Sequence, residues 1–199
     1  MTSRDISRLE REFGRPNQLR PATDEVDLHN INWDTIFVSP YLIHWISYIV
    51  SDNLALNSPV FMSSVFDDPV YAYQRLGNGS LAVNGEVKSD NTECSCTHRD
   101  LRPWLTADLL DYFFVRRVVF VNRKTSEDRL HDLNVTVGTN NVTFPCFCGF
   151  FSGPGTSHQK VDMVCAENCR GRYVRLQITS PVPEYLQLCE VEVYSDCNI

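Results

Sequence analysis

Cysteine is the residue type whose number and spacing say most about the chemistry of this chain. All eight cysteines among the 199 residues lie after residue 93, in the segments CSC, CFC and CAENC and at Cys189 and Cys197. An even number of cysteines in one region favours a disulfide framework, which persists in oxidising compartments. Structural zinc is the alternative, but zinc sites usually have CxxC spacing, whereas these pairs are spaced CxC and CxxxC. We therefore expect disulfides.

Three N-x-S/T sequons, at Asn78, Asn134 and Asn141, agree with an extracellular, secreted glycoprotein. The start of the chain is charged and polar, however, and has neither the apolar core nor the small-residue cleavage site of a signal peptide. A chain that lacks its true start, or carries a spurious one, would account for this. We expect secretion although the chain has no recognisable signal peptide.

The sequence lacks the motifs of common enzyme classes. It contains no G-x-S-x-G elbow, no H-E-x-x-H helix and no G-x-x-x-x-G-K-[ST] phosphate loop. Glu190 and Glu192 share one face of a predicted strand, but such pairs are more often solvated or ion-binding than catalytic. The net charge is −7 and the basic residues are scattered, which argues against a nucleic-acid partner. We expect a binding protein and not an enzyme.

The elements that position these residues are mostly strands. Apolar, mostly β-branched residues predominate over 115–122, and apolar residues alternate with polar ones over 133–137 and 173–179. Gly, Pro and Asn clusters separate these segments, and no long helical period follows Asn53. This pattern predicts an all-β domain at 53–199, an antiparallel β-sandwich or barrel.

Residues 1–52 differ in character and are predicted to form an N-terminal extension. A short charged helix is expected over 7–15, because prolines and an acidic cluster follow it. The apolar stretch 36–50 is shorter than the roughly 20 residues that cross a bilayer, and it contains Pro40 and His44. We expect it to pack against the main domain, with no membrane span.

The last predicted strand changes phase at Cys189-Glu190. Leu186 and Leu188 share one face, whereas Val191 and Val193 have the opposite parity. A bulge or bend at Cys189-Glu190 would keep both apolar pairs in the core. It would also turn the Glu190 carboxylate out of the ladder.

Two segments together give a family resemblance. The segment ECSCTHRDLRPWLTADLL, beginning at Glu93, and GRYVRLQITSPVPEYLQLCEVEVYS, beginning at Gly171, resemble the F-type lectins, the fucolectin or eel-agglutinin family. The resemblance runs from about Asn53 to Tyr194. It implies a discoidin-like (F5/8 type C-like) β-sandwich or jelly roll that binds fucose and holds a calcium ion.

The implied calcium site joins two distant parts of the chain. Residues 82–85 (AVNG) occupy the position of the family's A-x-D-G loop, with Asn84 where the family usually has aspartate. Calcium takes roughly six to eight oxygen ligands, backbone carbonyls included. An ordinary polar turn at Asn84-Gly85 is the alternative. The implied ligands are the Leu81 carbonyl, Asn84, Glu86, Ser95, the Cys189 carbonyl and Glu190.

The resemblance also implies two disulfides. Cys96 is expected to pair with Cys189, which would bring the two halves of the calcium site together. Cys165 matches a second half-cystine of the family, whose partner is expected to be Cys148 or Cys146.

The sugar site implied by the family consists of a histidine and two later basic residues. His98 and Arg123 match the spacing, and Arg129 matches the last basic position if one residue has been deleted. An arginine fork can bind two adjacent ring hydroxyls, and a histidine nitrogen can bind the axial hydroxyl of fucose. Thr125 stands where the family has aspartate, and the family's paired cysteines are replaced near Ser126-Glu127.

The resemblance therefore predicts an extracellular lectin for fucosylated glycans or glycoproteins. Useful avidity would need several copies of the site, on a homo-oligomer or a longer chain. The alternative is an adhesion or scaffold module of the same fold that has lost sugar binding.

Overall fold

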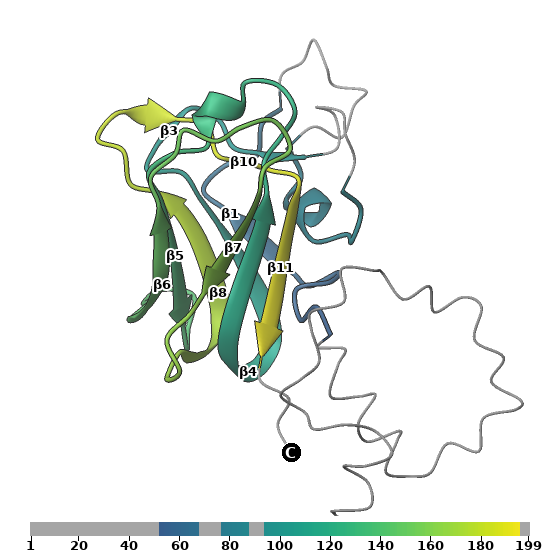
Figure 1. Cartoon of the computed structure of the whole chain (residues 1–199), viewed down its shortest axis with the longest axis vertical. Coiled ribbons are helices and arrows are strands. Elements are labelled where there is room, and N and C mark those ends of the chain that lie inside the picture. Colours follow the sequence, from purple (N-terminus) through teal and green to yellow (C-terminus); the bar gives the residue numbers. More distant parts are fainter. Residues whose placement is uncertain (1–51, 68–76, 88–93, 196–199) are drawn as a thin grey trace, which may run out of the picture. The chain divides into compact units, whose positions relative to one another are not determined.

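The computed structural model describes residues 52–67, 77–87 and 94–195. Within these ranges the chain forms strands and two short 3-10 helices, labelled η (Figure 1). The first elements are β1 (Val60–Met62), η5 (Gly79–Ala82), β2 (Ser95–Cys96), β3 (Asp100–Leu101), β4 (Trp104–Val121) and η6 (Glu127–Arg129). The remaining strands are β5 (Leu133–Gly138), β6 (Cys146–Phe151), β7 (Lys160–Val164), β8 (Arg170–Ile178), β9 (Pro183–Glu184), β10 (Gln187–Leu188) and β11 (Glu190–Ser195).

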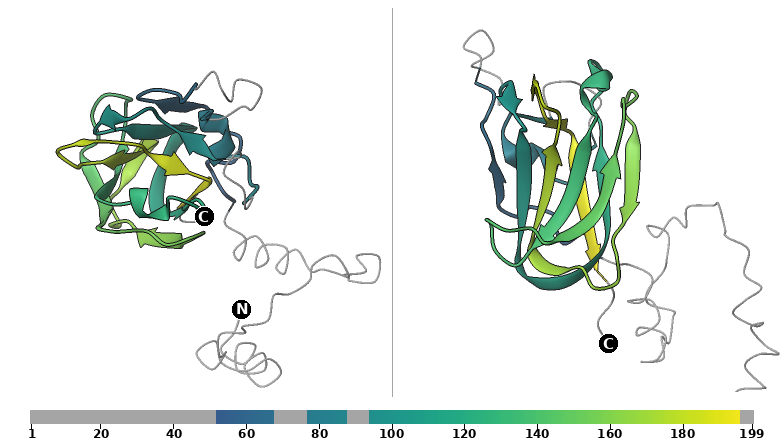
Figure 2. Two further views of the ribbon diagram at one scale, coloured as in Figure 1. Left: turned by 90° about the horizontal axis from the view of Figure 1, so that it is seen from above. Right: turned by 90° about the vertical axis from the view of Figure 1, so that its left-hand side faces the viewer.

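Strand β4 is long enough to belong to both layers of a sandwich. Its first half lies between β1 and β8 in the order β1-β4-β8-β5-β6, and its second half pairs with β7 and β11. All of these pairings are antiparallel. The pairing with β8 is irregular between Asp108 and Phe113, where β4 passes from one layer to the other. Figure 2 shows the two layers side by side in its right-hand view.

The core fills the space between the layers. Val174, Leu176 and Ile178 alternate with outward-facing residues along β8, as the sequence predicts. Phe120 of the other layer is fully buried and meets Phe151 edge-on, with 6.1 Å between the ring centroids. Burial of these side chains is the main favourable contribution to folding.

The structure confirms the predicted fold class, an all-β antiparallel sandwich. The predicted phase change is also present: β10 pairs with β2, β11 pairs with β4, and Cys189 lies between them. As a result, Leu188 and Val191 are both buried. No helix in the described ranges is long and apolar enough to cross a membrane. The predicted extension, its helix at 7–15 and the apolar stretch 36–50 lie outside these ranges.

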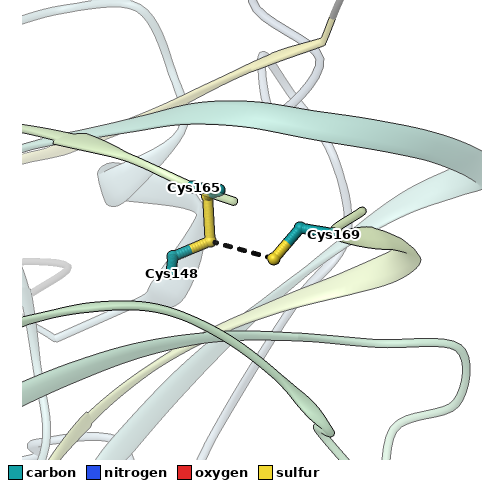
Figure 3. Close-up of side chains that lie close together, drawn as sticks. All are labelled: Cys148, Cys165 and Cys169. Carbon is teal, nitrogen blue, oxygen red and sulfur yellow. Dashed lines mark hydrogen bonds between the residues drawn. A yellow bond between two sulfur atoms is a disulfide. The ribbon is translucent and has the colours of Figure 1, made fainter. Parts of the chain in front are cut away.

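Three disulfides connect six of the seven cysteines that the structure describes. Cys148 pairs with Cys165, one of the two partners considered above, and Cys146 pairs with Cys169. These bonds tie β6 to residues flanking β7 and β8, and the Sγ atoms of Cys148 and Cys169 lie 4.0 Å apart (Figure 3). Cys197 lies outside the described ranges.

The expected disulfide between Cys96 and Cys189 is wrong. Strands β2 and β10 pair antiparallel, with Ser95 opposite Leu188 and Cys96 opposite Gln187. This register places Cys94 opposite Cys189, and the two form the third disulfide, with 4.0 Å between their Cα atoms. Among the described cysteines, Cys96 is left as a free, buried thiol.

Candidate functional site

The three residues expected to bind sugar lie in two loops and in η6, at the end of the sandwich that carries β3 and β10 (Figure 1). His98 lies between β2 and β3, and its backbone amide donates to Ser64 Oγ at 2.9 Å. Its Nε2 lies 2.9 Å from Asp67 Oδ1, and both side chains are exposed. Because Asp67 occupies Nε2, a ligand must use Nδ1 of His98 or replace Asp67.

Two aromatic rings connect His98 to Arg129. Phe66 lies 5.6 Å from the His98 ring and 6.3 Å from the Tyr185 ring, between centroids. The Arg129 guanidinium lies over Tyr185, 4.6 Å from the ring centroid. The four side chains therefore form a continuous cluster, although they come from four separate segments of the chain.

Arg123 lies deeper than the other two basic residues. Its Nε is buried and has no hydrogen-bond partner among the described residues, and its Nη2 lies 3.4 Å from Thr125 Oγ1. Burial lowers the pKa of Arg123, and the positive charge of Arg129 lowers it further, against the opposing effect of Cys96. A guanidinium in this position favours a ligand that supplies oxygen acceptors.

Asn122 fixes the loop that carries Arg123. Its side chain is buried, and its Nδ2 donates to the carbonyls of Glu127 and Thr156, both at 2.9 Å. Its Oδ1 accepts the backbone amide of Arg123 at 2.9 Å. The Asn122-Arg123 pair thus has a local structural basis: the first residue holds the loop, and the second carries the charge.

Cys96 and Gln187 form a small polar cluster near Arg123. Gln187 Nε2 donates to the Cys96 sulfur at 3.1 Å, while Gln187 Oε1 is buried without a partner among the described residues. Burial raises the pKa of the Cys96 thiol, and the bond from Gln187 and the charges of Arg123 and Arg129 partly oppose this. Cys96 is therefore a neutral thiol at neutral pH.

The structure places His98 and Arg123 in loops and Arg129 in η6, at the same end of the sandwich. Sequence reasoning missed Asp67, Phe66 and Tyr185, which contact the predicted residues. The segment PEYLQLCE that contains Tyr185 was recognised, but nothing in one sequence shows which way an aromatic side chain points.

The residues expected to bind calcium lie near a different feature, the buried carboxylate of Glu190. This residue is 1% exposed, and its Oε1 and Oε2 accept the backbone amide of Gly85 at 3.3 Å and 3.2 Å. Burial raises its pKa to about 7, and the charge of Glu192 adds to the effect. The neighbouring Lys160 bonds to Glu192 instead, at 3.2 Å.

The other expected ligands lie on the elements around Glu190. Ser95 is buried on β2 and donates through Oγ to the Leu188 carbonyl at 2.9 Å. Leu81 lies in η5, and in the following turn Asn84 Oδ1 accepts the amide of Glu86 at 2.9 Å. Cys189 directly precedes Glu190 and is joined to Cys94.

This environment fits a hard divalent cation. The two oxygens of the buried Glu190 carboxylate share one amide donor, which compensates their negative charge only in part. The pKa of Glu190 is raised for this reason. Carboxylate, amide and hydroxyl oxygens with backbone carbonyls are the ligands that calcium prefers. Leu81, Asn84, Glu86, Ser95, Cys189 and Glu190 are the residues that would hold it.

The chain is similar to known proteins in sequence. A family model described as a NedA-like, galactose-binding domain matches residues 81–176. Fucolectin of Anguilla anguilla is 32% identical over 124 residues, which cover 59% of this chain and 76% of the relative. Fucolectin-6 of Anguilla japonica is 29% identical over 147 residues, covering 72% of this chain and 76% of the relative.

A solved structure is also similar. The crystal structure of an F-lectin (fucolectin) from the serum of striped bass, Morone saxatilis, has a TM-score of 0.62 and 26% identity to this chain. The similarity covers 74% of this chain and 48% of the bass protein. This chain therefore spans about half the length of that protein.

Proposed function

Because the chain belongs to the F-type lectin (fucolectin) family, we propose that it is an extracellular lectin for fucose and fucosylated glycans, with its sugar site at His98, Arg123 and Arg129. Lectins bind carbohydrate without converting it, and the chain is a binding protein and not an enzyme. Secretion is proposed with it and is supported by three disulfides in one compact domain.

The observation that carries the proposal is a series of side-chain contacts that runs from His98 through Phe66 and Tyr185 to Arg129. Arg123, whose Nε has no partner among the described residues, lies at the same end of the sandwich. Sugar recognition needs polar groups for the hydroxyls and an apolar surface for the ring faces. Arg123 and Arg129 supply guanidinium donors, and His98 supplies a ring nitrogen.

Tyr185 and Phe66 provide the apolar surface in this proposal. The family's paired cysteines are missing near Ser126-Glu127, so their disulfide cannot pack against a sugar here. A ring that already stacks on Arg129 is held in place, so that its ordering adds little entropic cost to ligand binding. We therefore assign the packing role of the missing disulfide to Tyr185.

Calcium has a structural role in this proposal. An ion bound by Glu190 and the residues around it would hold the Asn84 turn against β2 and β11, and would offset the charge of the buried carboxylate. Such an ion stabilises the fold that carries the sugar site and takes no part in contacting the sugar.

A glycan array with and without calcium tests this function. The proposal expects binding restricted to fucosylated glycans, weak for single sugars and stronger on dense surfaces. Arg170→Ala is a matched control for variants of the site, because Arg170 is an exposed arginine at the start of β8, where its guanidinium lies near the rings of Tyr112 and Phe114. Binding of no fucosylated glycan at millimolar concentration would favour the alternative, an adhesion or scaffold module of the same fold.

A further inference from the structure

The outer face of the larger layer carries exposed aromatic side chains at one edge. Strand β6 is the last strand of the order β1-β4-β8-β5-β6. On this strand, Phe147 is 54% exposed and Phe150 is 49% exposed. Exposed apolar side chains on an edge strand favour association between sheets of different molecules.

A bulge brings both rings to the same face. Val135 pairs with Gly149 and Thr136 pairs with Phe147, so that Cys148 is an extra residue in β6. Phe147 and Phe150 are three residues apart, and without the bulge they would point to opposite faces. Cys148 turns instead toward Cys165 and closes the disulfide.

The neighbouring strand β5 presents a glycosylation sequon to these rings. Asn134 and Thr136, the two recognised residues of Asn134-Val135-Thr136, lie on the outer face, whereas Val135 is buried. Asn134 pairs with Phe150, and Thr136 pairs with Phe147. Residues directly opposite in an antiparallel pair have Cβ atoms about 5 Å apart, so that their side chains are in contact range.

We propose that Asn134 carries an N-linked glycan whose first sugars lie over Phe150 and Phe147. In this modification Asn134 Nδ2 loses a proton and bonds to the anomeric carbon of the first N-acetylglucosamine, and the lipid diphosphate that carried the oligosaccharide leaves. The apolar face of the sugar ring then removes part of the two phenylalanine surfaces from water. The bulk of the glycan also keeps another strand from pairing with β6.

The other two sequons have different surroundings. Asn78 caps η5, and its Oδ1 accepts the amide of Ser80 at 3.0 Å. Asn141 Oδ1 accepts from Nη2 of Arg175 at 3.4 Å, and the Arg175 guanidinium lies over the rings of Trp104 and Phe144. Asn134 therefore differs from both in facing exposed phenylalanine across the strand pair.

The test uses the full chain secreted from cultured eukaryotic cells behind a secretion leader. A Ser80→Ala/Asn141→Gln variant keeps only the Asn134 sequon and preserves the Asn78 side chain. Treatment with peptide-N-glycosidase in oxygen-18 water, followed by mass spectrometry, should find a labelled aspartate at position 134. Thr136→Ser should keep this modification, and Thr136→Ala should remove it.

Whether the glycan covers Phe147 and Phe150 is measured separately from whether Asn134 is modified. Enzymatic removal of the glycan should increase binding of a hydrophobic dye and shift the protein to larger species in sedimentation. In a Phe147→Ser/Phe150→Ser background, glycan removal should change neither. An unmodified Asn134 in the secreted protein would overturn the proposal, and so would a glycan whose removal leaves dye binding and sedimentation unchanged. The proposal depends on secretion but not on fucose binding, so a failed glycan array leaves it intact.

Discussion

The carboxylate of Glu190 and the backbone amide of Gly85, 105 positions apart in the sequence, are in direct contact. The contact joins the Asn84 turn to β11 and places a buried charge where the protein itself offers little compensation. Stability should therefore depend on the protonation of Glu190 and on any cation that binds it.

Without calcium, the free energy of unfolding should fall as the pH rises from about 4.5 to about 7. The Glu190 pKa is raised from 4.5 to about 7 by burial, so in this window the folded protein holds a proton that the unfolded chain has released. The free energy of unfolding falls by at most about 3 kcal/mol, because each unit of pKa difference corresponds to roughly 1.4 kcal/mol. Urea unfolding across this range in the presence of chelator measures it, and Glu190→Gln should flatten the profile. If the free energy of unfolding falls equally in Glu190→Gln, the fall comes from other titratable groups.

Calcium should raise the melting temperature at pH 7. A ligand that binds only the folded state stabilises it by about 3 kcal/mol at a hundredfold excess over its Kd. Glu190→Gln should abolish the shift, and Glu192→Gln should retain most of it, because the Glu192 carboxylate already bonds to Lys160 and Tyr194. Differential scanning calorimetry with calcium or chelator measures both. Identical melting curves in the two conditions would show that this chain has no calcium site.

Cys96 should react with iodoacetamide only after unfolding. The thiol is buried, and burial raises its pKa, so that little thiolate is present and reagents do not reach it. Peptide mapping after alkylation should find the alkyl group on Cys96 in denatured protein and a linked peptide that contains Cys94 and Cys189. Rapid labelling in the native state, or a Cys96–Cys189 link, would contradict the described register of β2 and β10.

Much of the fold could be predicted from the sequence because it depends on local periodicity. Alternation along β8 identified its buried face, and the parity change at Cys189-Glu190 located the break between β10 and β11. The choice between Cys94 and Cys96 could not be made in this way. The two cysteines are two residues apart, so an extended chain turns both to the same side, and only the register of β2 with β10 decides which one meets Cys189.

The candidate sugar site was predictable only in part, for a related reason. His98, Arg123 and Arg129 came from a family spacing that survives in the sequence. Tyr185 and Phe66 come from segments far from these residues in the chain, and their contacts with Arg129 and His98 arise only when the loops meet in the folded protein. Spacing along the chain carries no information about such contacts.

Tyr185→Ala should weaken fucose binding about tenfold or more, whereas Tyr185→Phe should leave it nearly unchanged. The ring supports Arg129 and offers an apolar surface, and a stacking contact of this kind contributes about 1 to 2 kcal/mol. Titration calorimetry with methyl fucoside measures the affinities, and the melting temperature of each variant reports its folding. Equal affinities for Tyr185→Ala and the wild type would exclude Tyr185 from the site.

Retention on immobilised fucose, compared between the wild type and Arg123→Ala, tests the central claim most directly. The account predicts that the wild type is retained and eluted by free fucose, and that Arg123→Ala passes through although it still unfolds in one cooperative melting transition. Thr125→Asp should bind more tightly than the wild type, because a carboxylate beside Arg123 replaces the 3.4 Å contact with a charge-assisted bond. Retention of Arg123→Ala equal to that of the wild type would contradict the account and place the sugar elsewhere.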